Sequence, residues 1–118
     1  MSDTFRTSET RKKYSEYQAS GAMETGCDLC EKVSLKEFKH WRIVQNTFPY
    51  DRIAKMHDML IPRRCVRWQD LTQDEVDEFF LIKEGHLQEY DHLIESTQKS
   101  SSIPKHYHLH LIVKGNDV

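Results

Sequence analysis

The segment His106-Tyr107-His108-Leu109-His110-Leu111-Ile112-Val113, close to the end of the chain, decides the fold. Successive side chains of a strand point to opposite faces, so the three imidazoles share one face at spacings of roughly 6.6 Å. The interleaved Tyr107, Leu109 and Leu111 share the other face, and two β-branched residues follow them, which suits a strand packed on other structure. The segment therefore predicts a strand with one apolar and one chemically reactive face.

Three interpretations of the histidines follow from the residues alone. A His-rich, solvated strand is the first. A three-histidine metal centre is the second, because facing imidazoles bind zinc, copper or iron. In the third, one histidine is a covalent nucleophile toward phosphorus, while its neighbours orient the ring and bind the oxyanion. The in-phase apolar face argues against the first interpretation and leaves the other two open.

Composition limits the partners that the chain can have. Its 118 residues suffice for one domain, and 17 basic against 19 acidic residues leave a net charge of -2, so no strong field attracts a nucleic acid polymer. No apolar run approaches the roughly 18 residues of a spanning helix, and we expect no membrane association. Three cysteines are an odd number for a disulfide framework. We expect a cytoplasmic protein in a reducing compartment.

The order of predicted elements indicates an α+β fold. Residues 1–20 read as a polar N-terminal extension with a helix over 8–19, and residues 21–118 as the domain. Strands are predicted over 38–47 and 56–62, each bounded by a proline. Thr72-Gln73-Asp74-Glu75 has the spacing of a capping box and opens an apolar pattern of helical period, which predicts one long helix of roughly 25 residues. The histidine strand follows, so an antiparallel sheet is expected.

Three segments together resemble the histidine triad (HIT) superfamily of nucleotide hydrolases and transferases. The first is His-x-His-x-His with its apolar tail. The second, residues 57–65 (His-Asp-Met-Leu-Ile-Pro-Arg-Arg-Cys), is similar to the family's strand His-x-Leu-Val-Ile-Pro-Lys-x-His. The third, residues 46–50 (Asn-Thr-Phe-Pro-Tyr), resembles an element of the diadenosine-polyphosphate and uridylyltransferase-like branches. The resemblance covers roughly residues 27–115 and implies a HIT-like fold, which we expect as a homodimer.

The resemblance also implies roles for individual residues. His108 would attack the α-phosphorus of a purine nucleotide or dinucleotide, giving a nucleotidyl-histidine that water cleaves. His110 would hydrogen-bond the phosphate oxygens, His57 would lie near the same pocket, and Asn46 and Tyr50 would contact the ribose. Uridylyltransferase-type members carry glutamine at the position of His110. The histidine therefore favours hydrolysis of a nucleotide phosphoramidate or a dinucleoside polyphosphate.

One departure from the family pattern weakens the case for catalysis. Family hydrolases carry Gly-Gln-Ser or Gly-Gln-Thr just before the triad, where this chain has Ser100-Ser101-Ser102-Ile103-Pro104-Lys105. Ser102 supplies a hydroxyl one residue early, the missing glycine removes a close backbone approach to phosphate, and Lys105 would compensate. Two alternatives therefore stand: a zinc-stabilised nucleotide-binding module with little catalysis, and a nucleotidyltransferase or phosphorylase.

The pair Cys27-x-x-Cys30 predicts a structural zinc site. A loop with two buried thiols and a redox pair are the competing interpretations, and no thioredoxin-like pattern supports the latter. Zinc-bearing members of the superfamily place ligands at positions that here are Cys27, Cys30, Cys65 and His106, with histidine usual in place of Cys65. Four protein ligands leave no open position, so the metal would be structural. If the alignment is one element off, His57 would replace Cys65.

Overall fold

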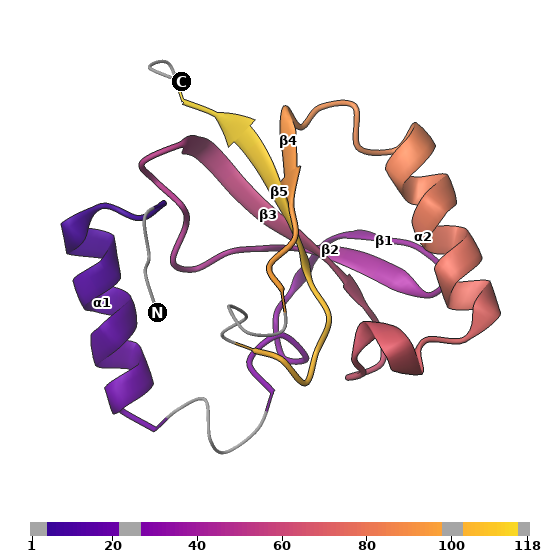
Figure 1. Ribbon diagram of the computed structural model, residues 1–118, viewed down its shortest axis with the longest axis horizontal. Coiled ribbons are helices and arrows are strands. Elements are labelled where there is room, and N and C mark those ends of the chain that lie inside the picture. Colours follow the sequence, from indigo (N-terminus) through magenta and orange to yellow (C-terminus); the bar gives the residue numbers. More distant parts are fainter. Residues whose placement is uncertain (1–4, 22–26, 98–102, 116–118) are drawn as a thin grey trace.

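The computed structural model describes residues 5–21, 27–97 and 103–115. Within these ranges, two α-helices and five strands form the α+β arrangement that the sequence predicts, and Figure 1 shows the helices on opposite sides of the sheet. In chain order the elements are α1 (Ser8–Ala19), β1 (Ser34–Glu37), β2 (Trp41–Gln45), β3 (Ala54–Pro62), a 3-10 helix (Trp68–Asp70), α2 (Gln73–Gly85), β4 (His92–Ile94) and β5 (Leu109–Lys114).

The five strands form one antiparallel sheet in the order β1-β2-β3-β5-β4. The nine-residue β3 is central, and its Met59 pairs with His110 of β5 while His57 pairs with Ile112. Residues directly opposite in an antiparallel pair share a face, as do residues two apart along one strand. The register therefore makes His57 and His110 diagonal neighbours on one face.

The two faces of the sheet carry separate apolar clusters. On one face Trp41, Leu60 and Leu111 pack with Phe79 and Ile82 of α2. The opposite face carries a smaller cluster formed by Leu29, Val44, Met59 and Ile61, and this face also holds the histidines. Burying one face under α2 thus leaves the other available for a site.

The histidine segment alternates as predicted, but its strand begins later. Tyr107 and Leu109 pack into the α2 cluster, while His106, His108 and His110 point to the other side. Strand β5 begins only at Leu109, which pairs with Leu60 of β3, and the backbone of Tyr107 donates to Val66 O instead (2.8 Å). Only His110 of the three lies within the sheet.

The predicted long helix is wrong in its length. Its capping box is present, with the side chains of Thr72 and Glu75 each accepting from the other residue's backbone N–H, but α2 has 13 residues and ends at Gly85. Glycine is the weakest helix former after proline. Leu87 and Tyr90 continue the apolar pattern because the loop after α2 turns them into the same cluster. The sequence also did not reveal β1, which is mostly exposed, or the three-residue edge strand β4.

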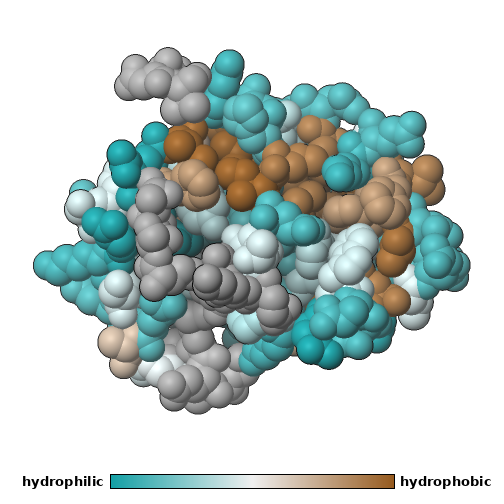
Figure 2. Space-filling view, viewed as in Figure 1, coloured by the Kyte–Doolittle hydropathy of each residue, from teal (hydrophilic) through white to brown (hydrophobic). Residues whose placement is uncertain are grey.

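Helix α1 has the predicted bounds and is followed by Gly21, whose positive φ of 77° ends it. No helix in the described part of the chain is both long and apolar enough to cross a membrane. Apolar side chains do reach the surface of α2, where Phe80 and Leu81 are 52% and 66% exposed. Figure 2 shows apolar residues gathered over this side of the molecule. The homodimer stays a prediction.

Candidate functional site

Three cysteines and the first triad histidine form a cluster beside the sheet. Each of Cys27, Cys30, Cys65 and His106 offers one ligand atom, and these atoms lie within 4.8 Å of one another. Nδ1 of His106 is 3.1 Å from Sγ of Cys27 and 3.5 Å from Sγ of Cys30. Zinc bonds of about 2.0–2.3 Å in tetrahedral geometry separate ligand atoms by roughly 3.5–3.8 Å. The cluster therefore has a size and a set of donor atoms that fit a closed Cys₃His site.

A backbone contact orients the histidine of this cluster. Nε2 of His106 donates to the carbonyl oxygen of Pro62 (3.0 Å), which leaves the lone pair of Nδ1 directed at the thiols. Burial lowers the pKa of His106, so the ring is neutral, as a metal ligand must be. Partners of this kind fix the tautomer of metal-binding histidines. Cys65 lies in the cluster, whereas His57 lies beside His110 and contacts its ring nitrogen.

His108 has its two ring nitrogens in different surroundings. Nδ1 donates to the carbonyl oxygen of His106 (2.9 Å), so Nε2 is left with a free lone pair in the neutral ring. The residue is 8% exposed, and burial lowers its pKa. A neutral imidazole with its second nitrogen unprotonated is the form in which histidine attacks an electrophile.

A chain of hydrogen bonds fixes the tautomers of the other two histidines. The backbone N–H of Tyr50 donates to Nδ1 of His57 (2.9 Å), so the proton of His57 is on Nε2 and is donated to Nδ1 of His110 (2.8 Å). His110 must then carry its proton on Nε2, which lies 3.1 Å from the Tyr50 hydroxyl. We call this arrangement the histidine relay. Its last N–H, on Nε2 of His110, is directed at the Tyr50 hydroxyl, which accepts it.

Burial keeps the relay neutral. Both rings are at most 4% exposed, and burial lowers the pKa of His57 to about 3 and that of His110 to about 2. The positive charge of Arg6 lowers both values further, as does His108 when it is protonated at low pH. The relay therefore donates hydrogen bonds near neutral pH without carrying charge.

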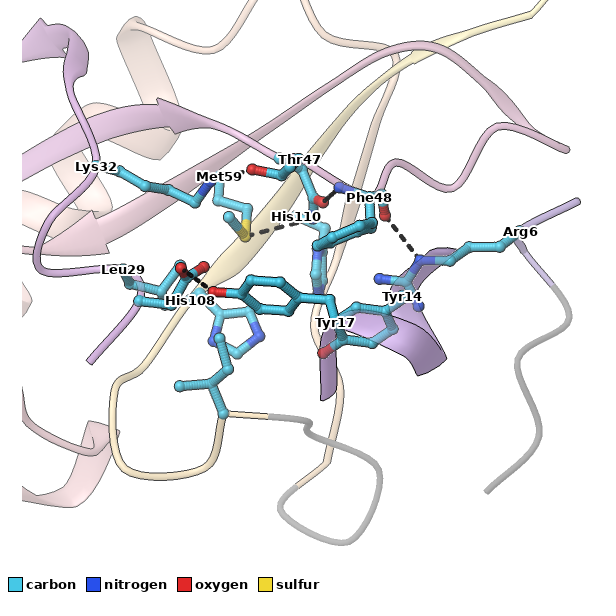
Figure 3. A pocket seen from close by; sticks show the side chains of 13 residues that line it. Arg6, Tyr14, Tyr17, Leu29, Lys32, Thr47, Phe48, Met59, His108 and His110 are labelled. Carbon is cyan, nitrogen blue, oxygen red and sulfur yellow. Dashed lines mark hydrogen bonds between the residues drawn. The ribbon is translucent and has the colours of Figure 1, made fainter. Parts of the chain in front are cut away.

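A pocket opens in front of His108 and His110, and we call it the triad pocket. Its wall includes Asn46 and Phe48 from the loop after β2, Leu29 beside the cysteine cluster, and the cations Arg6 and Lys32. Figure 3 shows Tyr17 of α1 lying across this pocket in front of His108. A second hollow, the side pocket, is also lined by His108 and has the following residues around it: Arg67, Trp68, Gln69, Thr97 and Tyr107. His108 thus stands between two cavities.

The other residues predicted for the site are placed as follows. Asn46 lines the triad pocket, and its Oδ1 accepts from Phe48 N (2.8 Å). Tyr50 lies behind the triad, with its ring 4.5 Å from that of His57 and 4.7 Å from that of His110. Lys105 is exposed and is in the lining of neither pocket. Ser102 lies outside the described residues.

The contribution of the N-terminal segment was not predicted. Arg6, Tyr14 and Tyr17 line the triad pocket, and the rings of Tyr14 and Tyr17 lie 5.0 Å and 5.2 Å from that of Phe48. Two tyrosines three residues apart on an otherwise polar helix were the available signal, because such residues share a face that needs a partner. Nothing in the local sequence indicated that this face packs on Phe48 at the triad pocket.

Comparison with solved structures identifies the fold of this chain. No family model and no curated protein matches the sequence. Among solved structures, the chain is similar to a HIT family hydrolase from Legionella pneumophila Philadelphia 1, with 20% identity and a TM-score of 0.52 over 77% of this chain and 93% of that one. It is likewise similar to a histidine triad protein from Clostridium difficile, with 17% identity and a TM-score of 0.53 over 81% and 94%. The chain has the fold of the histidine triad superfamily, as its motifs predict.

Proposed function

We propose that this protein is a nucleotide hydrolase that cleaves the bond between the α-phosphorus of a purine nucleotide and its leaving group. One observation carries the proposal: Nδ1 of His108 is held by the His106 carbonyl, which leaves Nε2 as the nucleophilic atom in a ring that lines the triad pocket. The substrate class would be a nucleotide phosphoramidate or a dinucleoside polyphosphate, in keeping with the motifs of the sequence.

The reaction would proceed in two displacements. Nε2 of His108 forms a bond to the α-phosphorus as the bond to the leaving group breaks, and the leaving group departs with a proton taken from solvent. Water then attacks the phosphorus, the phosphorus–nitrogen bond breaks, and the proton that water loses returns to solvent, so the products are a nucleoside monophosphate and neutral His108. The neutral His110 would stabilise the phosphate oxygens in both steps through its Nε2–H, which would donate to them in place of the Tyr50 hydroxyl that lies 3.1 Å from it. The side pocket would receive the leaving group.

Rapid mixing with adenosine 5′-phosphoramidate, followed by intact-mass analysis, tests the covalent step. The wild-type protein should gain the mass of an adenylyl group, and His108→Asn should gain none, with turnover lower by at least about a thousandfold. Asparagine keeps an amide donor near the His106 carbonyl but has no atom at the position of Nε2. His86→Asn, at the exposed C-terminal end of α2, is the matched control and should behave as wild type.

The departure from Gly-Gln-Ser at residues 100–105 favours a second candidate, a zinc-stabilised nucleotide-binding module with little catalysis. The same experiment separates the two. Tight binding of a nucleotide panel with neither adduct nor turnover would establish the module and refute the hydrolase. Adduct formation with release to an acceptor other than water would instead establish a nucleotidyltransferase or phosphorylase.

We also propose that Cys27, Cys30, Cys65 and His106 hold one structural zinc ion. The support is their convergence within 4.8 Å and the Pro62 carbonyl that orients the His106 ring. When bound, zinc would link the segment around Cys27 to the segment that carries the triad. Metal analysis of purified protein should find about one zinc per chain. Absence of stoichiometric metal, with thermal stability unchanged by a chelator, would refute the site.

A further inference from the structure

The segment before α1 is fixed beside the triad by an aspartate in the loop that follows β2. Asp51 accepts hydrogen bonds from the Thr7 backbone (2.8 Å), the Thr7 hydroxyl (3.0 Å) and the Thr10 hydroxyl. The Phe5 carbonyl accepts from the backbone of Arg52 (2.9 Å). These bonds lie on both sides of Arg6 and hold its backbone in one place.

The side chain of Arg6 is held between aromatic rings. Its Nε donates to the Phe48 carbonyl (2.7 Å), and its guanidinium lies 4.5 Å from the centre of the Tyr14 ring and 4.8 Å from that of Tyr50. The residue is only 7% exposed, yet it lines the same pocket as His108 and His110. Figure 3 shows the guanidinium directed from the N-terminal segment toward this pocket.

Tyr50 connects this cation to the relay. One face of the Tyr50 ring meets the guanidinium, its hydroxyl lies 3.1 Å from Nε2 of His110, and its ring lies 4.7 Å from the His110 ring. The positive charge of Arg6 acts on the relay, because it is among the causes that lower the pKa of His57 and of His110. A field that repels protons from these rings attracts an anion to the same place.

We infer that Arg6 is a phosphate-binding residue of this site, supplied by the N-terminal segment. It would bind a non-bridging oxygen of the α-phosphate opposite the N–H of His110, so that the phosphorus is held for attack by His108. Arginine suits this role because its planar guanidinium offers several N–H donors and stays charged when buried. The inference rests on the proposed nucleotide function and adds a recognition element that lies outside the HIT-like motifs of the sequence.

The test separates phosphate recognition from a merely structural role. Calorimetry compares the affinities of AMP and of adenosine, which differ by the phosphate alone, for the full chain and for Arg6→Gln. The variant should bind AMP more weakly by about tenfold to a hundredfold, as expected for one charge-assisted contact, and adenosine within about twofold. Arg6→Lys keeps the charge without the planar group and should fall between. Arg11→Gln, which removes a cation from the exposed side of α1, should match wild type.

Each other outcome has a defined meaning. If Arg6→Gln weakens AMP and adenosine equally, Arg6 only positions α1 and the inference is wrong. If both affinities stay unchanged, the inference is also wrong. Should Arg6→Gln fail to fold, Arg6→Lys decides by the same comparison of the two ligands. If wild type binds neither ligand and turns over no nucleotide, the proposed function itself fails, which is distinct from a nucleotide-active protein that does not need Arg6.

Discussion

Lowering the pH from about 7.5 to about 5 should destabilise the folded chain through the two buried histidines of the relay. In the unfolded chain a histidine has a pKa of about 6.5. In the folded chain burial lowers the pKa of His57 to about 3 and that of His110 to about 2. Below pH 6.5 the unfolded state takes up protons that the folded state refuses, so the free energy of unfolding falls as the pH falls.

The magnitude follows from the width of the pH window. A pH of 5 is about 1.5 units below the pKa of each histidine in the unfolded chain. At about 1.36 kcal/mol per unit, each ring therefore lowers the free energy of unfolding by about 2 kcal/mol. The two rings together give about 4 kcal/mol. The result does not depend on the native values in detail, because any native pKa below about 4 leaves the folded ring neutral throughout this window.

Urea unfolding of wild type and His57→Gln at both pH values measures the effect. Glutamine does not titrate and keeps a donor that can reach His110, so the variant should lose about 2 kcal/mol less than wild type between the two pH values. Protonation of carboxylates and of the cysteine cluster affects both proteins alike and cancels in this comparison. His92→Gln, on the exposed edge strand β4, is the control and should keep the full wild-type loss. An equal loss in wild type and His57→Gln would show that His57 is not held neutral, and the hydrogen-bond assignment of the relay would be wrong.

Three further substitutions test individual contacts. Cys65→Ser should lower the bound zinc, measured by metal analysis, and should lower the melting temperature, since three ligands remain. Tyr17→Phe removes the hydrogen bond from the hydroxyl to Asp28 (2.7 Å) and should cost about 0.5–1 kcal/mol in urea unfolding, because the contact is partly exposed. Thr72→Ala removes the capping side chain of α2 and should cost about 1 kcal/mol in the same assay.

The alternation of residues 106–111 was sufficient to predict the two faces of the sheet. The side-chain direction of an extended backbone depends on neighbouring residues alone, so it holds even where Tyr107 bonds to Val66 and the chain is outside the ladder. The convergence of Cys27 and His106, 79 residues apart, came instead from the resemblance to zinc-bearing HIT proteins. No local rule places such residues together.

The errors have a common physical origin. Apolar spacing records which residues face a core, and both a helix and a loop satisfy it, so the pattern that continues to Leu87 and Tyr90 was taken for helix beyond Gly85. For the same reason, the sequence did not show that α1 lines the triad pocket. Its tyrosines signalled a buried face, but the identity of the surface that buries it is a tertiary property, fixed here by Asp51 and Phe48.

The first two triad histidines are less independent than their separate predicted roles suggest. The ring of His106 belongs to the cysteine cluster, while its carbonyl oxygen accepts the hydrogen bond that sets the tautomer of His108. Ring and carbonyl belong to one residue, and Pro62 holds the ring from the other side. If the cluster holds the proposed zinc, any shift of this residue on loss of the metal would move the acceptor that keeps Nε2 of His108 unprotonated. A metal held by the cluster would act on the proposed nucleophile through a single residue, so its contribution would extend from the stability of the fold to the protonation state of Nε2 of His108.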